Sequence, residues 1–308
     1  MKVVFMGTPQ AAVPTLERLV ADGHEVVAVY TQPDKPSGRS NKITYSPVKQ
    51  FALDRGIEVL QPAKIKTSEA LERFISHNAD VAVVVAYGRI LPESFLTAFP
   101  KGAINVHFSL LPKYRGAAPV NWAIARGETT TGVTTMQMDA GLDTGDILLQ
   151  REAKIGESET APELTERLSV DGAELISKTL RTLDKIPPRA QDEAEASYAP
   201  LLKREDGLIV WDRSAKEIAD RVRGLQPFPS SFSYRNGQKI TIWRAAVRDL
   251  VGGELGTVAS IDKETFDIAC GGSSGLSVIE VQPEGKRRMS AADFVNGMRL
   301  KVGEVFGS

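Results

Sequence analysis

Apolar runs with strand period alternate with a run of helical period at the start of the chain. Lys2–Met6 has the pattern of a buried strand, Ala11–Ala21 carries apolar residues at helical spacing, and Glu25–Tyr30 has the pattern of a second strand. This order predicts a parallel βαβ unit with a right-handed crossover. The most hydrophobic strand, Asp80–Ala86, is expected at the centre of the sheet, covered on both faces. The turn after the first strand lacks a G-x-G-x-x-G fingerprint, which argues against a dinucleotide-dependent dehydrogenase.

The pattern changes near residue 187. Pro187–Pro200 is rich in proline and acidic residues and has no apolar period, which predicts an extended linker. One helix, Ala215–Leu225, then precedes many short strand-like runs, with a hairpin signal at Asn236-Gly237. We therefore predict an α/β domain with a Rossmann-like, mostly parallel open sheet at 1–186, a linker at 187–204, and a small β barrel or sandwich at 205–308.

Composition restricts the class of protein. With 42% hydrophobic and 25% charged residues, the chain is typical of a globular protein. A net charge of −1 means that any nucleic-acid contact must come from local basic patches. The single cysteine, Cys270, excludes an intramolecular disulfide and suits a reducing compartment. No stretch has the length of a membrane span and no signal pattern opens the chain, so we expect a cytoplasmic protein. We also expect a monomer.

The first candidate chemistry lies at the end of a predicted strand, Ala103–His107. Period-2 alternation puts Asn105 and His107 on the same side of that strand. An amide can donate a hydrogen bond to an oxygen that acquires charge, and an imidazole can donate or move a proton. In open α/β sheets, ligands bind at the carboxyl ends of strands. Either residue alone fits a solvated strand edge equally well, but the pair favours a reactive site.

Three carboxylates gather in the loop Asp139–Asp146. A cation site is disfavoured here, because the glycines and apolar residues of the loop leave too few further oxygen ligands. Asp139 and Asp146 fit turn and cap positions.

Basic residues are concentrated in two places. The polar loop Thr31–Lys42 contains Lys35, Arg39 and Lys42, and it is either a solvated surface loop or a phosphate-binding segment. Lys286-Arg287-Arg288 is the one tight basic cluster, in a β domain that serves either nucleic-acid binding or stability.

These motifs carry a family resemblance. Asn105-x-His107 followed by Ser109-Leu110-Leu111-Pro112, together with the segment Met136–Asp146, resembles the two signatures of the folate-dependent formyltransferases. The likeness runs over essentially the whole chain. It implies a Rossmann-like catalytic domain followed by an OB-like β barrel that binds tRNA.

The resemblance also implies roles for individual residues. The catalytic residues would be Asn105, His107 and Asp143, with no metal and no covalent intermediate. The expected reaction moves a formyl group from 10-formyltetrahydrofolate to the amino group of methionyl initiator tRNA. The folate-binding residues would be Tyr87, Gly88, Arg89, Ile90 and Leu91, with Ser109, Leu110, Leu111 and Pro112. The tRNA-binding residues would be Lys35, Arg39, Lys42, Lys286, Arg287 and Arg288.

Two alternatives to this reaction stay open. One is formyl transfer to a small amine, a glycinamide ribonucleotide or an amino sugar nucleotide, with the same three catalytic residues. The loop Thr31–Lys42 and the appended β domain argue against it, since a small acceptor does not obviously need them. The other is a nucleic-acid-binding module without activity, against which the intact Asn105, His107 and Asp143 set counts.

Overall fold

The computed structural model of the chain describes residues 1–37, 42–249 and 252–307. They form two compact units. The first comprises residues 1–119, 130–154 and 165–200, and the second comprises 120–129, 155–164 and 201–308. The predicted domain boundaries at 186 and 205 stay predictions.

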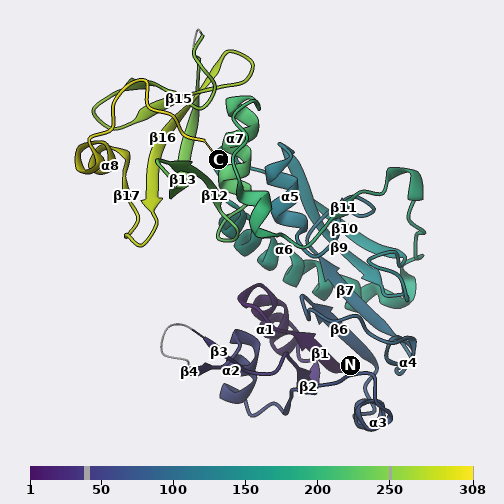
Figure 1. The fold of residues 1–308 in the computed structure, drawn as a ribbon. Coiled ribbons are helices and arrows are strands. Elements are labelled where there is room, and N and C mark those ends of the chain that lie inside the picture. The colour runs from purple at the N-terminus through teal and green to yellow at the C-terminus, as the bar shows by residue number, and fades with distance from the viewer. Residues whose placement is uncertain (38–41, 250–251, 308) are drawn as a thin grey trace. The chain divides into compact units, whose positions relative to one another are not determined.

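The first unit is built on a seven-stranded sheet (Figure 1). Its strands are β1 (Lys2–Gly7), β2 (Glu25–Tyr30), β5 (Val59–Leu60), β6 (Val81–Val85), β7 (Ala103–His107), β9 (Thr130–Gln137) and β10 (Ile147–Lys154). They follow the order β10-β9-β7-β6-β1-β2-β5, in which the strands from β7 to β5 are parallel and β9 and β10 are antiparallel. The predicted mostly parallel sheet is confirmed.

Helices cover this sheet on both faces. They are α1 (Val13–Ala21), α2 (Pro47–Asp54), α3 (Ser68–Ile75), α4 (Glu93–Leu96) and the long α6 (Ala161–Thr182). Short 3-10 helices of this unit lie at Gln10–Ala12, Leu183–Lys185 and Glu193–Glu195, and a further one, Arg204–Gly207, belongs to the second unit. Side-chain caps fix two helix starts, where Ser46 accepts the Lys49 N–H and Thr67 accepts the Ala70 N–H. All five residues of β6 are buried, as expected for a central strand.

Two small β pairs flank the main sheet. β3 (Lys35–Ser37) pairs with β4 (Lys42–Thr44), and β8 (Arg115–Gly116) pairs with β11 (Tyr198–Ala199). A side chain at Gly116 would begin 2.7 Å from the Ala199 carbonyl oxygen, so only glycine fits this approach. Residues 189–199, here named the connecting segment, fall in the predicted linker, yet they belong to the first unit and are hydrogen-bonded to its other parts.

The second unit is an antiparallel sheet with two helices of its own. Its elements are α7 (Ala215–Gly224), β12 (Ser231–Arg235), β13 (Gln238–Asp249), β14 (Val258–Ile261), β15 (Phe266–Cys270), β16 (Ser274–Pro283), β17 (Met289–Ser290) and α8 (Ala291–Met298). The order is β12-β13-β16-β15-β14, with β17 beside β16. The last residues of the chain bond to both ends of this order, Gly307 to Tyr234 and Glu304 to Val258. The sheet therefore curls toward closure, and the predicted C-terminal β domain is confirmed.

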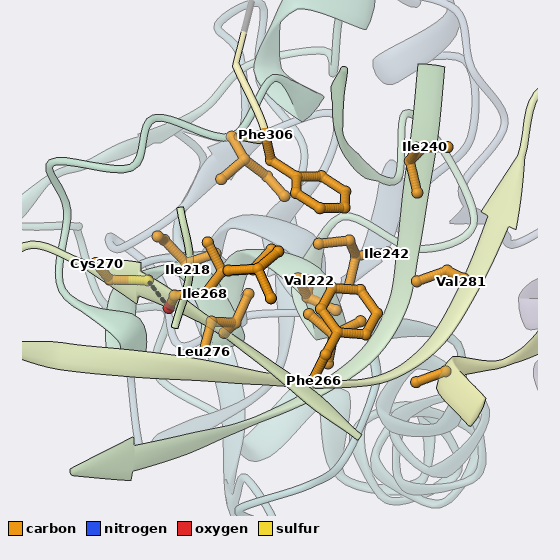
Figure 2. Packing of buried hydrophobic residues seen from close by; sticks show 14 of the residues in the cluster. Ile218, Val222, Ile240, Ile242, Phe266, Ile268, Cys270, Leu276, Val281 and Phe306 are labelled. Atoms are coloured by element: carbon orange, nitrogen blue, oxygen red, sulfur yellow. Dashed lines mark hydrogen bonds between the residues drawn. The ribbon is translucent and has the colours of Figure 1, made fainter. Parts of the chain in front are cut away.

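The core of the second unit lies between α7 and this sheet (Figure 2). Ile218 and Val222 of α7 lie among Phe266, Leu276 and Phe306, all of them buried. A further helix, α5 (Pro119–Ala125), packs against α7 where Gly224 allows close approach. Among the described helices, none is long and apolar enough to cross a membrane.

Candidate active site

The candidate site is built at the carboxyl end of β7. Every residue of β7 is buried, and the strand lies between β6 and β9. Asn105 and His107 point to the same face, as their spacing predicts, and are 8% and 6% exposed. The Asn105 amide has no hydrogen-bond partner among the described residues. It is therefore available to a ligand as a donor.

The His107 ring is oriented by the loop that follows β7. Its Nε2 lies 2.9 Å from the carbonyl oxygen of Tyr114. A carbonyl oxygen only accepts hydrogen bonds, so Nε2 carries the proton. The other ring nitrogen, Nδ1, lies 3.7 Å from Oδ2 of Asp143. That distance is too long for a direct hydrogen bond and short enough for electrostatic attraction to an imidazolium.

Asp143 reaches this position from the loop between β9 and β10. Its backbone has a φ of 55°, in the left-handed region, which aspartate tolerates better than most residues. Its Oδ2 accepts a hydrogen bond of 2.8 Å from the Gly116 N–H, while Oδ1 has no partner among the described residues. In the same loop, Asp139 accepts from the Gly141 N–H and the Thr144 hydroxyl, the turn role expected of it. No group of metal-binding side chains is found in the described part of the chain.

Arg115 directly precedes Gly116 in the chain and is completely buried. Its guanidinium donates to both carboxylate oxygens of Glu193, at 2.9 and 2.7 Å, and to Oε1 of Gln191. The hydrogen bonds between the two groups raise the pKa of Arg115 and lower that of the Glu193 carboxyl. The ion pair between Arg115 and Glu193 holds the backbone at Arg115 and Gly116 in place. It thereby orients the Gly116 N–H that donates to Asp143.

The predicted folate segment Ser109–Pro112 is tied into the protein. Thr134 donates to the Ser109 carbonyl and accepts from the Leu111 N–H, and Gln150 donates to the Leu111 carbonyl. Leu110 packs where a side chain at Gly132 would otherwise lie. Most main-chain groups of this segment are therefore engaged within the chain.

The other predicted folate segment, Tyr87–Leu91, is more open. It follows β6, the parallel neighbour of β7, so it lies at the same sheet edge as His107. The Tyr87 carbonyl accepts from Gln32, and Leu91 is buried in the core. Ile90 is 72% exposed, and the N–H and C=O groups from residues 88 to 90 have no partner among the described residues.

The predicted tRNA-binding residues fall in two regions of the chain. Arg39 lies outside the described residues, and Lys35 and Lys42 are placed by their backbone in the β3–β4 hairpin. Lys286, Arg287 and Arg288 are exposed in the turn between β16 and β17. Arg288 forms an ion pair with Glu280 at 2.9 Å, so its charge is partly neutralised.

Comparison with known proteins identifies the family. Residues 1–180 match the family model described as formyl transferase, and residues 201–299 match that of the formyl transferase C-terminal domain. The chain belongs to the formyltransferase family. A methionyl-tRNA formyltransferase of Solibacter usitatus is 48% identical over 100% of this chain and 99% of its own length. One from Acetivibrio thermocellus is 46% identical over 100% of both chains.

Solved structures of other formyltransferases share the fold. A sugar 3N-formyl transferase, WlaRD, aligns with a TM-score of 0.69 at 20% identity over 93% of this chain and 99% of its own. The N-formyltransferase from Helicobacter canadensis, in complex with folinic acid and dTDP-3-aminofucose, gives 0.68 at 21% identity over 90% and 98%. Glycinamide ribonucleotide transformylase 1 from Symbiobacterium toebii gives 0.50 at 21% over 62% and 93%. At these identities the likeness establishes the formyltransferase fold alone.

Local sequence pattern does not reveal the residues that hold this formyltransferase site in place. Gln191 and Glu193 sit in a proline-rich, acidic stretch whose composition is typical of a spacer. The sequence Lys113–Gly116 predicts a flexible basic turn, whereas Arg115 within it is buried and paired. A cation and a carboxylate so far apart in the chain carry no local pattern that would pair them.

Proposed function

We propose that the chain transfers the formyl group of 10-formyltetrahydrofolate to the amino group of methionyl initiator tRNA, as a cytoplasmic monomer. The observation that carries this proposal is the identity of 46–48% over the full length to methionyl-tRNA formyltransferases. That similarity spans both the sheet unit and the β unit. The sugar N-formyltransferases also align over 90–93% of this chain, so it is the identity to methionyl-tRNA formyltransferases, and not the β unit alone, that favours the tRNA acceptor.

The reaction is acyl transfer to an amine. The amino nitrogen attacks the formyl carbon, a C–N bond forms, and the bond to N10 of the folate breaks. The amine loses a proton and N10 gains one, so the exchange is balanced without an enzyme-bound intermediate. The free amide of Asn105 is suited to donate to the oxyanion of the tetrahedral intermediate, and one such donor contributes on the order of 3 kcal/mol.

His107 and Asp143 are suited to handle the protons. With Nε2–H committed to Tyr114, the nitrogen that faces Asp143 is Nδ1. In the neutral ring this nitrogen is an acceptor, as is the carboxylate opposite. An N–H donor placed between Nδ1 and the Asp143 carboxylate, such as the attacking amine, can bond to both acceptors. Protonation of Nδ1 to give an imidazolium also removes the clash of two acceptors. Oδ1 of Asp143 is free among the described residues to accept the amine proton.

For the folate, we propose that Tyr87–Leu91 supplies the main-chain contacts and Ile90 an apolar surface for the pterin. Ser109–Pro112 then shapes the site mainly through its fixed backbone. For the tRNA, we propose phosphate contacts from Lys35, Arg39 and Lys42 and from Lys286, Arg287 and Arg288.

Transfer to a small amine is the second candidate. It is favoured by the sugar N-formyltransferases and the glycinamide ribonucleotide enzyme among the structural neighbours, which support it only through a shared fold. The deciding experiment offers methionyl initiator tRNA, a charged elongator tRNA and an amino sugar nucleotide in parallel with 10-formyltetrahydrofolate. Formylation of the initiator tRNA far above the other acceptors is expected. Preferred formylation of the sugar would overturn the proposal.

A further inference from the structure

The connecting segment lies where neither family model matches, between residues 180 and 201. It nevertheless contacts both loops that flank His107. Ser197 accepts the Tyr114 N–H through its hydroxyl and the Arg115 N–H through its carbonyl. Glu193 holds the Arg115 side chain. The segment therefore supports the candidate site from outside both family-defined domains.

Gln191 is the residue of this segment that reaches the loop of Asp143. Its Nε2 donates to the carbonyl oxygen of Asp143 at 2.8 Å and to that of Gly145 at 2.7 Å. Its Oε1 accepts from Nε and Nη2 of Arg115 at 3.0 and 2.9 Å. One amide thus satisfies four hydrogen bonds between two segments.

These hydrogen bonds close a ring around Asp143. The Asp143 carbonyl is bound to Gln191, Gln191 is bound to Arg115, and the next residue, Gly116, donates its N–H to the Asp143 carboxylate. A residue with φ of 55° needs such restraint, because left-handed backbone is unfavourable for side-chain-bearing residues unless its surroundings fix it.

We propose that Gln191 is a positioning residue for Asp143, holding its backbone so that the carboxylate stays opposite Nδ1 of His107. A reactive group displaced by about 1 Å can cost about 100-fold in rate. The inference rests on the proposed function for its kinetic test and on the hydrogen bonds alone for its spectroscopic test.

The test variant is Gln191→Glu in the full chain. A glutamate still accepts from Arg115, so the segment stays docked, but it has no donor for the Asp143 and Gly145 carbonyls. Gln191→Met removes the hydrogen bonds to Arg115 as well as those to the Asp143 and Gly145 carbonyls, and it keeps a side chain of similar length. Glu195→Gln is the matched control, because Glu195 is exposed on the same segment and no contact of its side chain is found among the described residues.

We expect Gln191→Glu to lower kcat at least tenfold while KM for folate and tRNA stays within about twofold, with Glu195→Gln near wild type. In an Asp143→Asn background the same change should cost less than about threefold. The proposal would be overturned if Gln191→Glu kept the wild-type kcat. It would also be overturned if Gln191→Glu lowered kcat as much in the Asp143→Asn background as it does in the wild type.

The second readout needs no activity. The chain has three histidines, and His24 and His77 bond elsewhere, so NMR of labelled imidazoles has two internal controls. The ring resonances of His107 should move in Gln191→Glu and Gln191→Met while those of His24 and His77 stay. Unchanged His107 resonances in a folded variant would refute the positioning role. A wild-type chain that does not formylate tRNA would refute the proposed function instead.

Discussion

The Nδ1 atom of His107 lies 3.7 Å from Oδ2 of Asp143, and a single loop holds both side chains. Tyr114 binds the far side of the imidazole through its carbonyl, and Gly116 binds the carboxylate through its N–H. The separation of the two reactive groups is thus set by a three-residue stretch. That stretch is fixed in turn by the buried side chain of Arg115.

This arrangement predicts that His107 and Asp143 act as a unit. His107→Ala and Asp143→Asn should each lower kcat/KM by about 100-fold or more, in line with the removal of a positioned proton-transfer group. The asparagine still offers an oxygen to the Gly116 N–H, so it removes the charge and leaves the loop bonded. The measurement is initial formylation rate in both single variants and the double variant. A double variant whose loss equals the product of the single losses would contradict the coupling.

Local pattern predicts much of this fold. The strand Ala103–His107 is predicted with the bounds of β7, because alternation and a following proline-containing turn are both local signals. Burial of β6 follows from its run of valine and alanine. In the second unit, the pattern does not predict α8, since its eight residues include Gly297 and lie among strand-like runs.

The support of the site is not predictable in this way. The left-handed backbone falls on Asp143, although the two glycines of its loop are the residues that would adopt such angles most easily. Gly145 serves close approach instead, since a side chain there would begin 1.8 Å from the Gln137 carbonyl oxygen. Such approaches, like the hydrogen bond between Gln191 and Asp143, arise from tertiary packing and leave no periodic trace in the sequence.

Folate binding should depend on Ile90. Burial of an isoleucine side chain against a ligand is worth about 1.5–3 kcal/mol, so Ile90→Asp should weaken binding of a folate analogue by at least about tenfold. Ile75→Asp is the matched control, since Ile75 is also exposed, at the end of α3. Binding by fluorescence or calorimetry provides the comparison. Equal affinities for the two variants would remove Tyr87–Leu91 from the folate site.

The thiol of Cys270 should be inert and dispensable for catalysis. It is 3% exposed and donates to the Ile268 carbonyl, and burial raises its pKa to about 11. Cys270→Ala should therefore keep formylation activity, and alkylation of the folded chain at about pH 8 should be far slower than that of the unfolded chain. Loss of activity on a stoichiometric alkylation of the native chain, without unfolding, would count against this.

The same thiol predicts a pH dependence of stability. Its pKa is higher in the folded chain than the ordinary value of 9.0, so the unfolded chain binds fewer protons between these two values. The free energy of unfolding should fall as pH rises from about 9 to about 11, because the folded state resists losing the proton. Urea unfolding of wild type and Cys270→Ala across this range isolates the effect. Parallel curves for the two proteins would show that the thiol does not contribute.

Binding of tRNA should be separable from chemistry. Arg39→Ala should weaken formylation of methionyl initiator tRNA while folate binding is unchanged, because a cation in the loop Thr31–Lys42 is suited to phosphate. The affinity for tRNA should fall linearly with salt concentration when both are plotted as logarithms. Removing one phosphate-binding cation should make the slope of that line shallower by a little less than about 1. Alanine at all three of Lys286, Arg287 and Arg288 should reduce the slope by less than three times that amount, since Arg288 is already paired with Glu280.

The measurement is tRNA binding and initial rate against salt for wild type, Arg39→Ala and the triple variant. Lys263→Ala is a control for the removal of one exposed cation in the second unit. If Lys286, Arg287 and Arg288 act by their position and not through the net charge of the protein, Lys263→Ala should leave the affinity for tRNA and its salt dependence near wild type. The reason is that moderate salt screens charges that lie more than about 10 Å apart. If Arg39→Ala weakens folate binding and leaves the tRNA slope intact, the loop serves the folate pocket. The proposal that it binds tRNA would then fail, while the test of the β unit by the triple variant would stand on its own.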